Sequence, residues 1–106
     1  MIIGIPTDDE VKVSEHFGRS KFFLIVKIES GKLIERRLHE NPHNRESDDQ
    51  MGHGMVLKLM TDNGVNKVIC TNMGPKMVDN LVKLKIAIER CRPESSITEV
   101  LGMEAV

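Results

Sequence analysis

The alternation of short apolar runs with polar connections along the chain predicts an α/β fold. An apolar run at residues 1–6 ends at a proline and is too short for a helix, so we expect a buried strand there. Residues 21–29 and 32–38 are two further apolar-rich runs separated by a Ser-Gly pair, a combination typical of a β-hairpin. The polar segment 39–54 has no periodicity and is expected to be a long, exposed and mobile loop.

The second half of the chain predicts helices that alternate with strands. Apolar residues recur at helical spacing from residue 51 to a glycine at residue 64, and Pro75 opens a second helix. Residues 67–71 and 86–88 are expected to be short strands, and residues 96–99 match a capping box that begins a terminal helix. The side chains expected to face inward are Met51, Met55, Val56, Leu59 and Met60 in the first helix and Val78, Leu81 and Val82 in the second.

The expected order of elements, βββαβαβα, implies a mixed five-stranded sheet with helices on both faces. The strand at residues 1–6 should pair antiparallel with the first hairpin strand and parallel with the strand at residues 67–71. In such sheets, ligands favour the crevice beyond the carboxyl ends of the parallel strands. We therefore expect the loops at residues 7–20 and 71–75 to be neighbours in space and to form a binding site.

Length and composition limit the classes of function. A chain of 106 residues with ordinary globular composition indicates one domain over residues 1–106. Its formal charge of -1 and its lack of Trp and Tyr disfavour nucleic-acid binding. No apolar run approaches the roughly 20 residues that span a bilayer, and signal-peptide features are absent, so we expect a cytoplasmic protein without membrane contact. The thiols of Cys70 and Cys91 are expected to be reduced.

The two loops expected at the sheet edge carry groups that suit an anion. Residues 14–19 contain an imidazole, a guanidinium, a hydroxyl and a glycine. Residues 71–76 lead into a helix, and a helix N-terminus offers unpaired N–H groups and a partial positive charge. This loop is therefore expected to hold a phosphate, a carboxylate or an anionic cluster.

Four segments, taken in order, resemble the dinitrogenase iron-molybdenum cofactor biosynthesis family: the first strand, residues 13–20 with the phenylalanines that follow, residues 52–54 (Gly-His-Gly), and residues 71–76. The resemblance implies a ribonuclease H-like fold and the binding or carriage of an iron-molybdenum or related metal-sulfur cluster. It places His16 at the histidine of an HFG motif implicated in cluster binding, and Gly74 at a GP pair. The cofactor-binding residues expected in this way are His16, Phe17, Gly18, Arg19, Asn72, Met73, Gly74 and Pro75.

Metal-sulfur clusters are held by thiolates and imidazoles, and His16 is the strongest candidate ligand, ahead of Cys70 and His53. Cys70 lies on a β-branched strand and is expected first to be a core residue. No C-x-x-C spacing exists, so any cluster would be held loosely or between two chains. Segment 39–54 also contains several histidines and carboxylates, namely His39, His43, His53, Glu46, Asp48 and Asp49. We expect these side chains to be solvated in a loop, and the alternative is that they form a weak divalent-metal site.

These observations favour a carrier over an enzyme, with an anionic metal cluster as its ligand and a cluster donor or acceptor protein as its partner. A regulatory or assembly domain that binds a partner protein through an edge strand or the segment 39–54 is the alternative. Ribonuclease H-like phosphoryl transfer requires several carboxylates around metals about 4 Å apart. The strands at residues 2–5 and 67–70 contain no carboxylate, so that chemistry is disfavoured.

Overall fold

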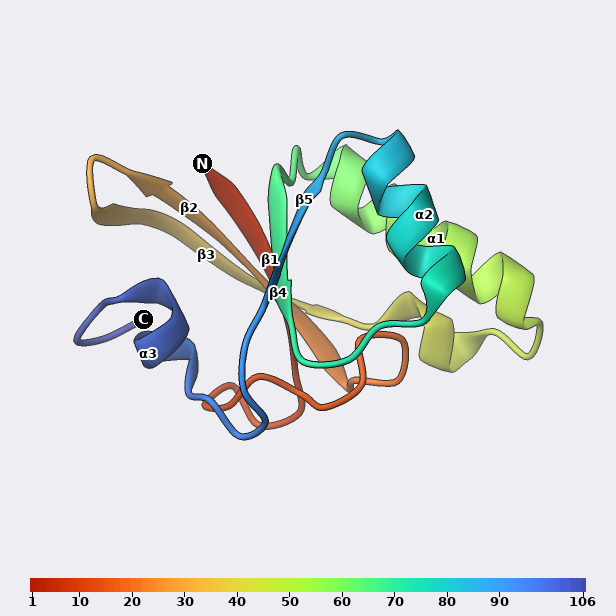
Figure 1. The fold of residues 1–106 in the computed structure, drawn as a ribbon, viewed down its shortest axis with the longest axis horizontal. Coiled ribbons are helices and arrows are strands. Elements are labelled where there is room, and N and C mark those ends of the chain that lie inside the picture. Colours follow the sequence, from red (N-terminus) through yellow and green to blue (C-terminus); the bar gives the residue numbers. More distant parts are fainter.

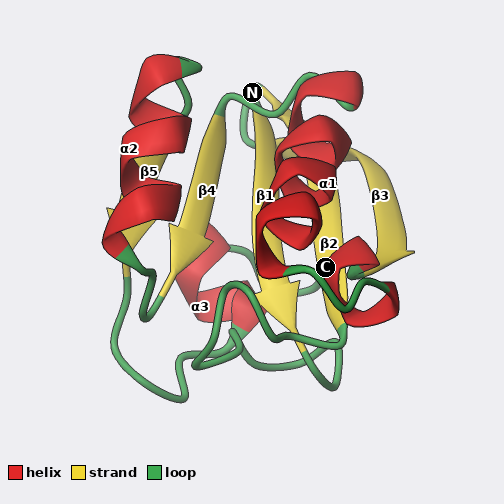
Figure 2. Ribbon diagram, turned by 90° about the vertical axis from the view of Figure 1, so that its right-hand side faces the viewer, coloured by secondary structure: helices red, strands yellow, loops and turns green.

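The structure, a computed structural model that describes residues 1–106, is built on a five-stranded mixed sheet in the order β3-β2-β1-β4-β5 (Figure 2). The strands are β1 (Ile2–Thr7), β2 (Phe22–Glu29), β3 (Lys32–Glu40), β4 (Lys67–Cys70) and β5 (Ala87–Arg90). The helices are a 3₁₀ turn η1 (Pro42–Arg45), α1 (Asp49–Asp62), α2 (Pro75–Lys83) and α3 (Ile97–Leu101). None of these helices has the length and apolar content needed to cross a bilayer.

The pairing of the strands confirms the predicted directions. β1 runs antiparallel to β2 and parallel to β4, and β4 runs parallel to β5. The carboxyl ends of β1, β4 and β5 therefore lie at the same edge of the sheet. The loops that leave these three strands gather at that edge (Figure 2).

Helices cover both faces of the sheet, as predicted: α1 and α2 lie on one face and α3 on the other (Figure 1). Successive side chains of a strand point to opposite faces, so the central strands supply two cores. Phe23 packs with Val56, Met60 and Leu81 under α1 and α2, whereas its neighbour Leu24 belongs to the second core. Burial on both faces explains why β1, β2 and β4 are almost continuously apolar.

The start of α1 and the inner faces of α1 and α2 differ from the prediction. α1 begins at Asp49, before Met51, because the Asp48 carboxylate accepts hydrogen bonds from two first-turn amides and so caps the helix. Gly52, Val56 and Met60, spaced four residues apart, form the buried row of α1. Met51 and Met55 precede this row by one position each and are 59% and 39% exposed.

In α2 the buried side chains are Met77 and Leu81. Val82, predicted to face inward, is 62% exposed, and Val78 is half-buried. The predicted and observed inner faces share Leu81, but the observed face includes Met77 where the prediction placed Val78 and Val82. Met77 faces inward because it packs in the same core as Phe17 and Cys70.

The prediction of a long, exposed loop over residues 39–54 is wrong. Residues 39 and 40 complete β3, residues 42–45 form η1, and α1 begins at Asp49. Side chains rather than apolar periodicity organise this segment: Asn41 caps η1 by accepting from the His43 amide, and Asp48 caps α1.

We predict from these bonds that hydrogen exchange is slow within segment 39–54. The Asn41 amide donates to the Lys21 carbonyl at 3.0 Å, and the Gly52 amide donates to the Asp48 carbonyl at 2.9 Å. Both amides should exchange at least about tenfold more slowly than the amide of exposed Ser47, which has no acceptor within the protein. Native-state exchange followed by NMR measures this difference. Equal exchange at all three amides would show that the segment is as mobile as its sequence indicates.

Candidate functional site

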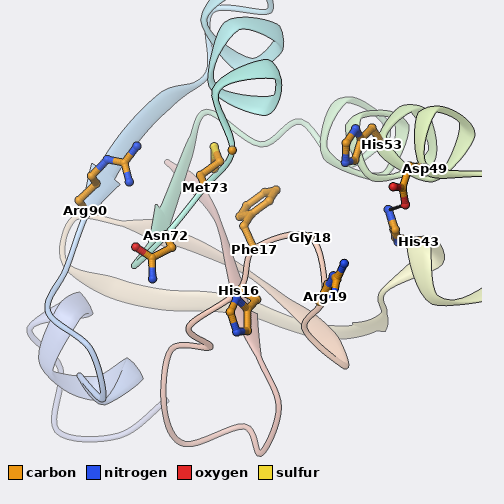
Figure 3. A pocket seen from close by; sticks show the side chains of 11 residues that line it. His16, Phe17, Gly18, Arg19, His43, Asp49, His53, Asn72, Met73 and Arg90 are labelled. Atoms are coloured by element: carbon orange, nitrogen blue, oxygen red, sulfur yellow. Dashed lines mark ion pairs between the residues drawn. The ribbon is translucent and has the colours of Figure 1, made fainter.

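An open cavity of about 450 Å³ lies beyond the carboxyl ends of β1, β4 and β5. Figure 3 shows its walls: side chains from η1 and α1 stand on one side, side chains from the β4–α2 turn and β5 stand on the other, and Phe17 lies between them. The lining residues are His16, Phe17, Gly18, Arg19, His43, Asp49, His53, Asn72, Met73, Gly74 and Arg90.

The two loops predicted to be neighbours meet at the base of this cavity. His16 and Asn72 form an isolated parallel β-bridge, and the Phe17 amide donates to the Asn72 carbonyl at 3.4 Å. This contact confirms the predicted proximity. It continues the pairing of β1 and β4 past the ends of both strands.

A buried phenylalanine and a chain of hydrogen bonds hold the loop between β1 and β2. Phe17 is 2% exposed, and its ring centroid lies 5.0 Å from that of Phe23. The Asp8 carboxylate accepts from the Lys21 amide at 2.9 Å and from the Ser14 hydroxyl at 3.1 Å. The Ser14 hydroxyl in turn accepts from the His16 amide at 3.2 Å. With the backbone fixed in this way, the His16 side chain remains exposed beside the cavity.

A carboxylate also holds the first turn of this loop. Asp9 accepts from the amides of Val11 and Lys12, each at 2.9 Å. These hydrogen bonds, led by that from Lys12, keep the pKa of Asp9 below its usual value. The turn is therefore stabilised while Asp9 is ionised, and this contribution is lost as the pH falls through the lowered pKa.

Buried Asn41 joins the β1–β2 loop to the wall formed by η1 and α1. Its side-chain amide donates to the carbonyl oxygens of Ser20 at 3.0 Å and Gly18 at 3.3 Å, and its Oδ1 accepts from the His43 amide at 3.0 Å. Asn41 is 1% exposed, so no water competes for these bonds. A single side chain thus fixes the η1–α1 wall relative to the β1–β2 loop at the base of the cavity.

Two histidines form the upper part of the η1–α1 wall. The His43 and His53 rings lie 5.4 Å apart, and His43 Nε2 lies 3.5 Å from an Asp49 carboxylate oxygen (Figure 3). A Cβ at Gly52 would lie 2.5 Å from the His43 ring, so glycine is required for this packing.

The alternative of a divalent-metal cluster in segment 39–54 receives no support. His43, His53 and Asp49 share the cavity, but His39 lines a separate hollow beside Met55. No group of three or more His, Cys, Asp or Glu side chains is arranged to hold a metal ion.

The opposite wall presents a helix N-terminus and a guanidinium. The amides of Lys76 and Met77 lie in the first turn of α2 and therefore have no acceptor within the helix. Gly74, the N-cap, has no side chain that could accept from them instead. Arg90 ends β5 and donates to the Thr71 carbonyl at 3.4 Å. Arg90 was not among the binding residues expected from the sequence. Its position at the carboxyl end of a third parallel strand could have indicated that it lies at the same edge of the sheet as the two loops.

The charges around the cavity favour an anion. Arg19 and Arg90 are permanently cationic, and Asp49 is the one carboxylate in the lining. His16 and the α2 N-terminus add a further donor and a partial positive charge to the same opening. The cavity is thus a locally positive site in a chain of net charge -1.

Cys70 lies beneath the cavity rather than in its lining. The residue is fully buried in the core under α1 and α2, and burial raises the pKa of its thiol while the nearby Arg90 guanidinium opposes the rise. Cys91 packs on the other face of the sheet, and both thiols are free. This placement agrees with the interpretation of Cys70 as a core residue.

A second cavity of about 280 Å³ adjoins the first, and Pro75, the one expected cofactor-binding residue outside the first lining, contributes to it. The two cavities together form one crevice, and every cofactor-binding residue expected from the sequence lines one or both of them. His53 also lines both cavities.

Residues 1–103 match the family described as dinitrogenase iron-molybdenum cofactor. An uncharacterized protein of Methanocaldococcus jannaschii is 32% identical over 96 residues, which make up 90% of this chain and 78% of that protein.

Solved structures share the fold over nearly the whole chain. A provisionally assigned dinitrogenase of Methanocaldococcus jannaschii gives a TM-score of 0.71 at 25% identity, covering 95% of this chain and 84% of the other. The apo form of the orange protein from Desulfovibrio gigas gives a TM-score of 0.79 at 14% identity, covering 95% and 83%. At that identity, the likeness to the orange protein shows the fold alone.

The bonds of Asn41 generate a stability prediction. Asn41→Ala should lower the free energy of unfolding by about 2 kcal/mol, because the Gly18 carbonyl loses its side-chain donor, the Ser20 carbonyl loses one of two, and the His43 amide loses its acceptor. Asn44→Ala is the matched control: Asn44 is exposed and donates to the Ser20 carbonyl at 2.9 Å, so its loss should cost less than about 1 kcal/mol. Urea unfolding measures both values. Equal, small effects would show that Asn41 does not fix the loop.

Proposed function

The chain belongs to the dinitrogenase iron-molybdenum cofactor family, and on this premise we propose that it binds an anionic metal-sulfur cluster in the 450 Å³ crevice and carries it. The cluster is iron-molybdenum cofactor-like or a related species, and it is cargo rather than a resident cofactor. The observation that carries the proposal is the convergence of an exposed imidazole, two guanidinium groups and an uncapped helix N-terminus on one opening.

The donor set fits a cluster that is held loosely. An iron- or molybdenum-sulfur core takes thiolate or imidazole ligands, and its negative charge is stabilised by N–H donors and cations. His16 supplies an imidazole that projects beside the cavity, whereas the Cys70 thiol is buried and its pKa is raised. Few covalent ligands combined with many charge contacts suit a cargo that must be released again.

Each group has a distinct role in this proposal. His16 supplies its imidazole to a metal of the cluster, Arg19 and Arg90 balance the charge of the sulfides, and the first amides of α2 donate hydrogen bonds to them. The backbone bonds of the β1–β2 loop hold His16 in place before the cluster arrives, which reduces the entropy lost on binding.

The lining of the crevice supports carriage rather than catalysis. The family resemblance implies a ribonuclease H-like fold, and enzymes of that fold carry out two-metal phosphoryl transfer with several carboxylates. Only one carboxylate, that of Asp49, lines this cavity. A carrier needs a cluster donor or acceptor protein as a partner. We place this exchange in the cytoplasm, where thiols and sulfides stay reduced.

We predict that His16→Ala weakens cluster binding at least tenfold with little change in stability. The lost imidazole is an exposed ligand, and surface substitutions usually change the free energy of unfolding by less than about 0.5 kcal/mol. The measurement is an anaerobic titration with a synthetic iron-sulfur cluster whose terminal ligands can be exchanged, followed by visible absorption. Glu15→Ala is the matched control, because Glu15 is exposed, adjacent and outside the crevice lining.

We predict the opposite pattern for Cys70→Ala. Loss of a buried sulfur should cost on the order of 1 kcal/mol of stability and leave binding nearly intact. Urea unfolding and the same titration separate the two effects. Unchanged affinity in His16→Ala together with loss of binding in Cys70→Ala would contradict the assignment and move the site to the thiol.

A further inference from the structure

The crevice has a second compartment whose chemistry differs from that of the first. The adjoining cavity of about 280 Å³ is lined mainly by the apolar side chains of Phe17, Met73, Pro75 and Met77, with His53 and Lys76 as its two polar side chains. The first compartment instead carries the guanidinium groups and most of the polar side chains. Both cavities are lined by Phe17, Gly18, His53, Met73 and Gly74, so the two compartments are continuous.

Two glycines stand at the boundary between the compartments. A Cβ at Gly18 or at Gly74 would meet nothing within 4 Å, and neither residue has a positive φ. Neither the packing nor the backbone conformation of the protein therefore requires glycine at these positions. Glycine loses more conformational entropy on folding than other residues do. Here the absence of side chains at Gly18 and Gly74 leaves an open passage between the two compartments.

The size and polarity of the compartments define a two-part ligand. A dry apolar cavity of about 150 Å³ accommodates benzene, so 280 Å³ leaves room for a group of ring size. A bare inorganic anion would occupy the cationic compartment and leave the apolar one to water that finds few hydrogen-bond partners. An anion with an attached apolar group would use both.

We propose that the crevice takes an anion that carries a ring-sized apolar group, so that the cargo is a cluster with an organic ligand. The identity of the anionic part rests on the proposed function, whereas the two-part shape rests on the paired cavities. The anionic part lies toward Arg19 and Arg90, which line the first compartment. The apolar group lies against Met73, Pro75 and Met77.

The test compares phenyl phosphate with inorganic phosphate at one pH and ionic strength, with ¹³C-methyl methionine NMR of the full chain as the readout. Phenyl phosphate should bind at least about tenfold more tightly, which corresponds to burial of about 60 Å² of apolar surface. It should shift the methyl signals of Met73 and Met77. The methyl signals of Met1 and Met103, which lie outside both cavities, should stay in place.

Closing the passage provides the matched variants. Gly18→Leu should reduce the preference for phenyl phosphate to below about threefold, because the new side chain enters the shared boundary. Gly54→Leu is the control: a Cβ there also meets nothing within 4 Å, but Gly54 lines neither compartment. Its preference should match that of the wild type.

The outcomes separate this inference from the proposed function. Equal affinities for the two phosphates, or shifts that leave Met73 and Met77 unaffected, would overturn the two-part ligand even if the synthetic iron-sulfur cluster binds. Failure of that cluster to bind together with the phenyl phosphate preference would overturn the cluster proposal and leave the two-part ligand standing.

Discussion

The parallel pairing of β1 with β4 is the constraint on which the site depends. Ile3 pairs with Lys67 and Gly4 with Val68, so both strands deliver their following loops to the same edge. The pairing resumes beyond the strands at His16 and Asn72, which places the candidate ligand beside the turn that opens α2. Burial of these strands on both faces fixes their position, and the residues that directly follow them, which line the crevice, are therefore held in place as well.

The second wall of the crevice depends on a different kind of interaction. The side chain of Asn41, rather than the sheet, ties the β1–β2 loop to η1, and packing of His43 against Gly52 ties η1 to α1. A buried amide with three partners is specific in direction and costly to break. The crevice is therefore bounded by one wall set by backbone pairing and another set by a polar side chain.

The sequence was sufficient for the sheet and for one half of the site. Apolar runs and helical spacing predicted the strands and helices, and the rule for parallel strand ends predicted that the loops at residues 7–20 and 71–75 meet. It was insufficient for segment 39–54, because Asn41 and Asp48 stabilise that segment through side chain–backbone bonds that leave no periodic signal. The predicted helix faces were shifted because a second row of apolar residues lies next to the buried row, one position before it in α1 and one position after it in α2.

Arg90 and Asn41 illustrate what a single sequence conceals about a site. Arg90 lies far along the chain from the other lining residues, and it enters the crevice because β5 pairs with β4. Asn41 resembles an ordinary turn residue until its burial is known. Both contributions arise from tertiary contacts, which local propensity does not encode.

The proposed binding of an anionic cluster in the crevice at the carboxyl ends of the parallel strands can be tested directly. The most direct measurement maps backbone amide shifts while ¹⁵N-labelled protein is titrated with tetrathiomolybdate without air. We expect shifts to begin at the amides of residues 16–19, 73, 74, 76 and 77 and to leave α3 and the β2–β3 turn unchanged. Shifts centred on α3 or on β3, or no shifts at all, would contradict it.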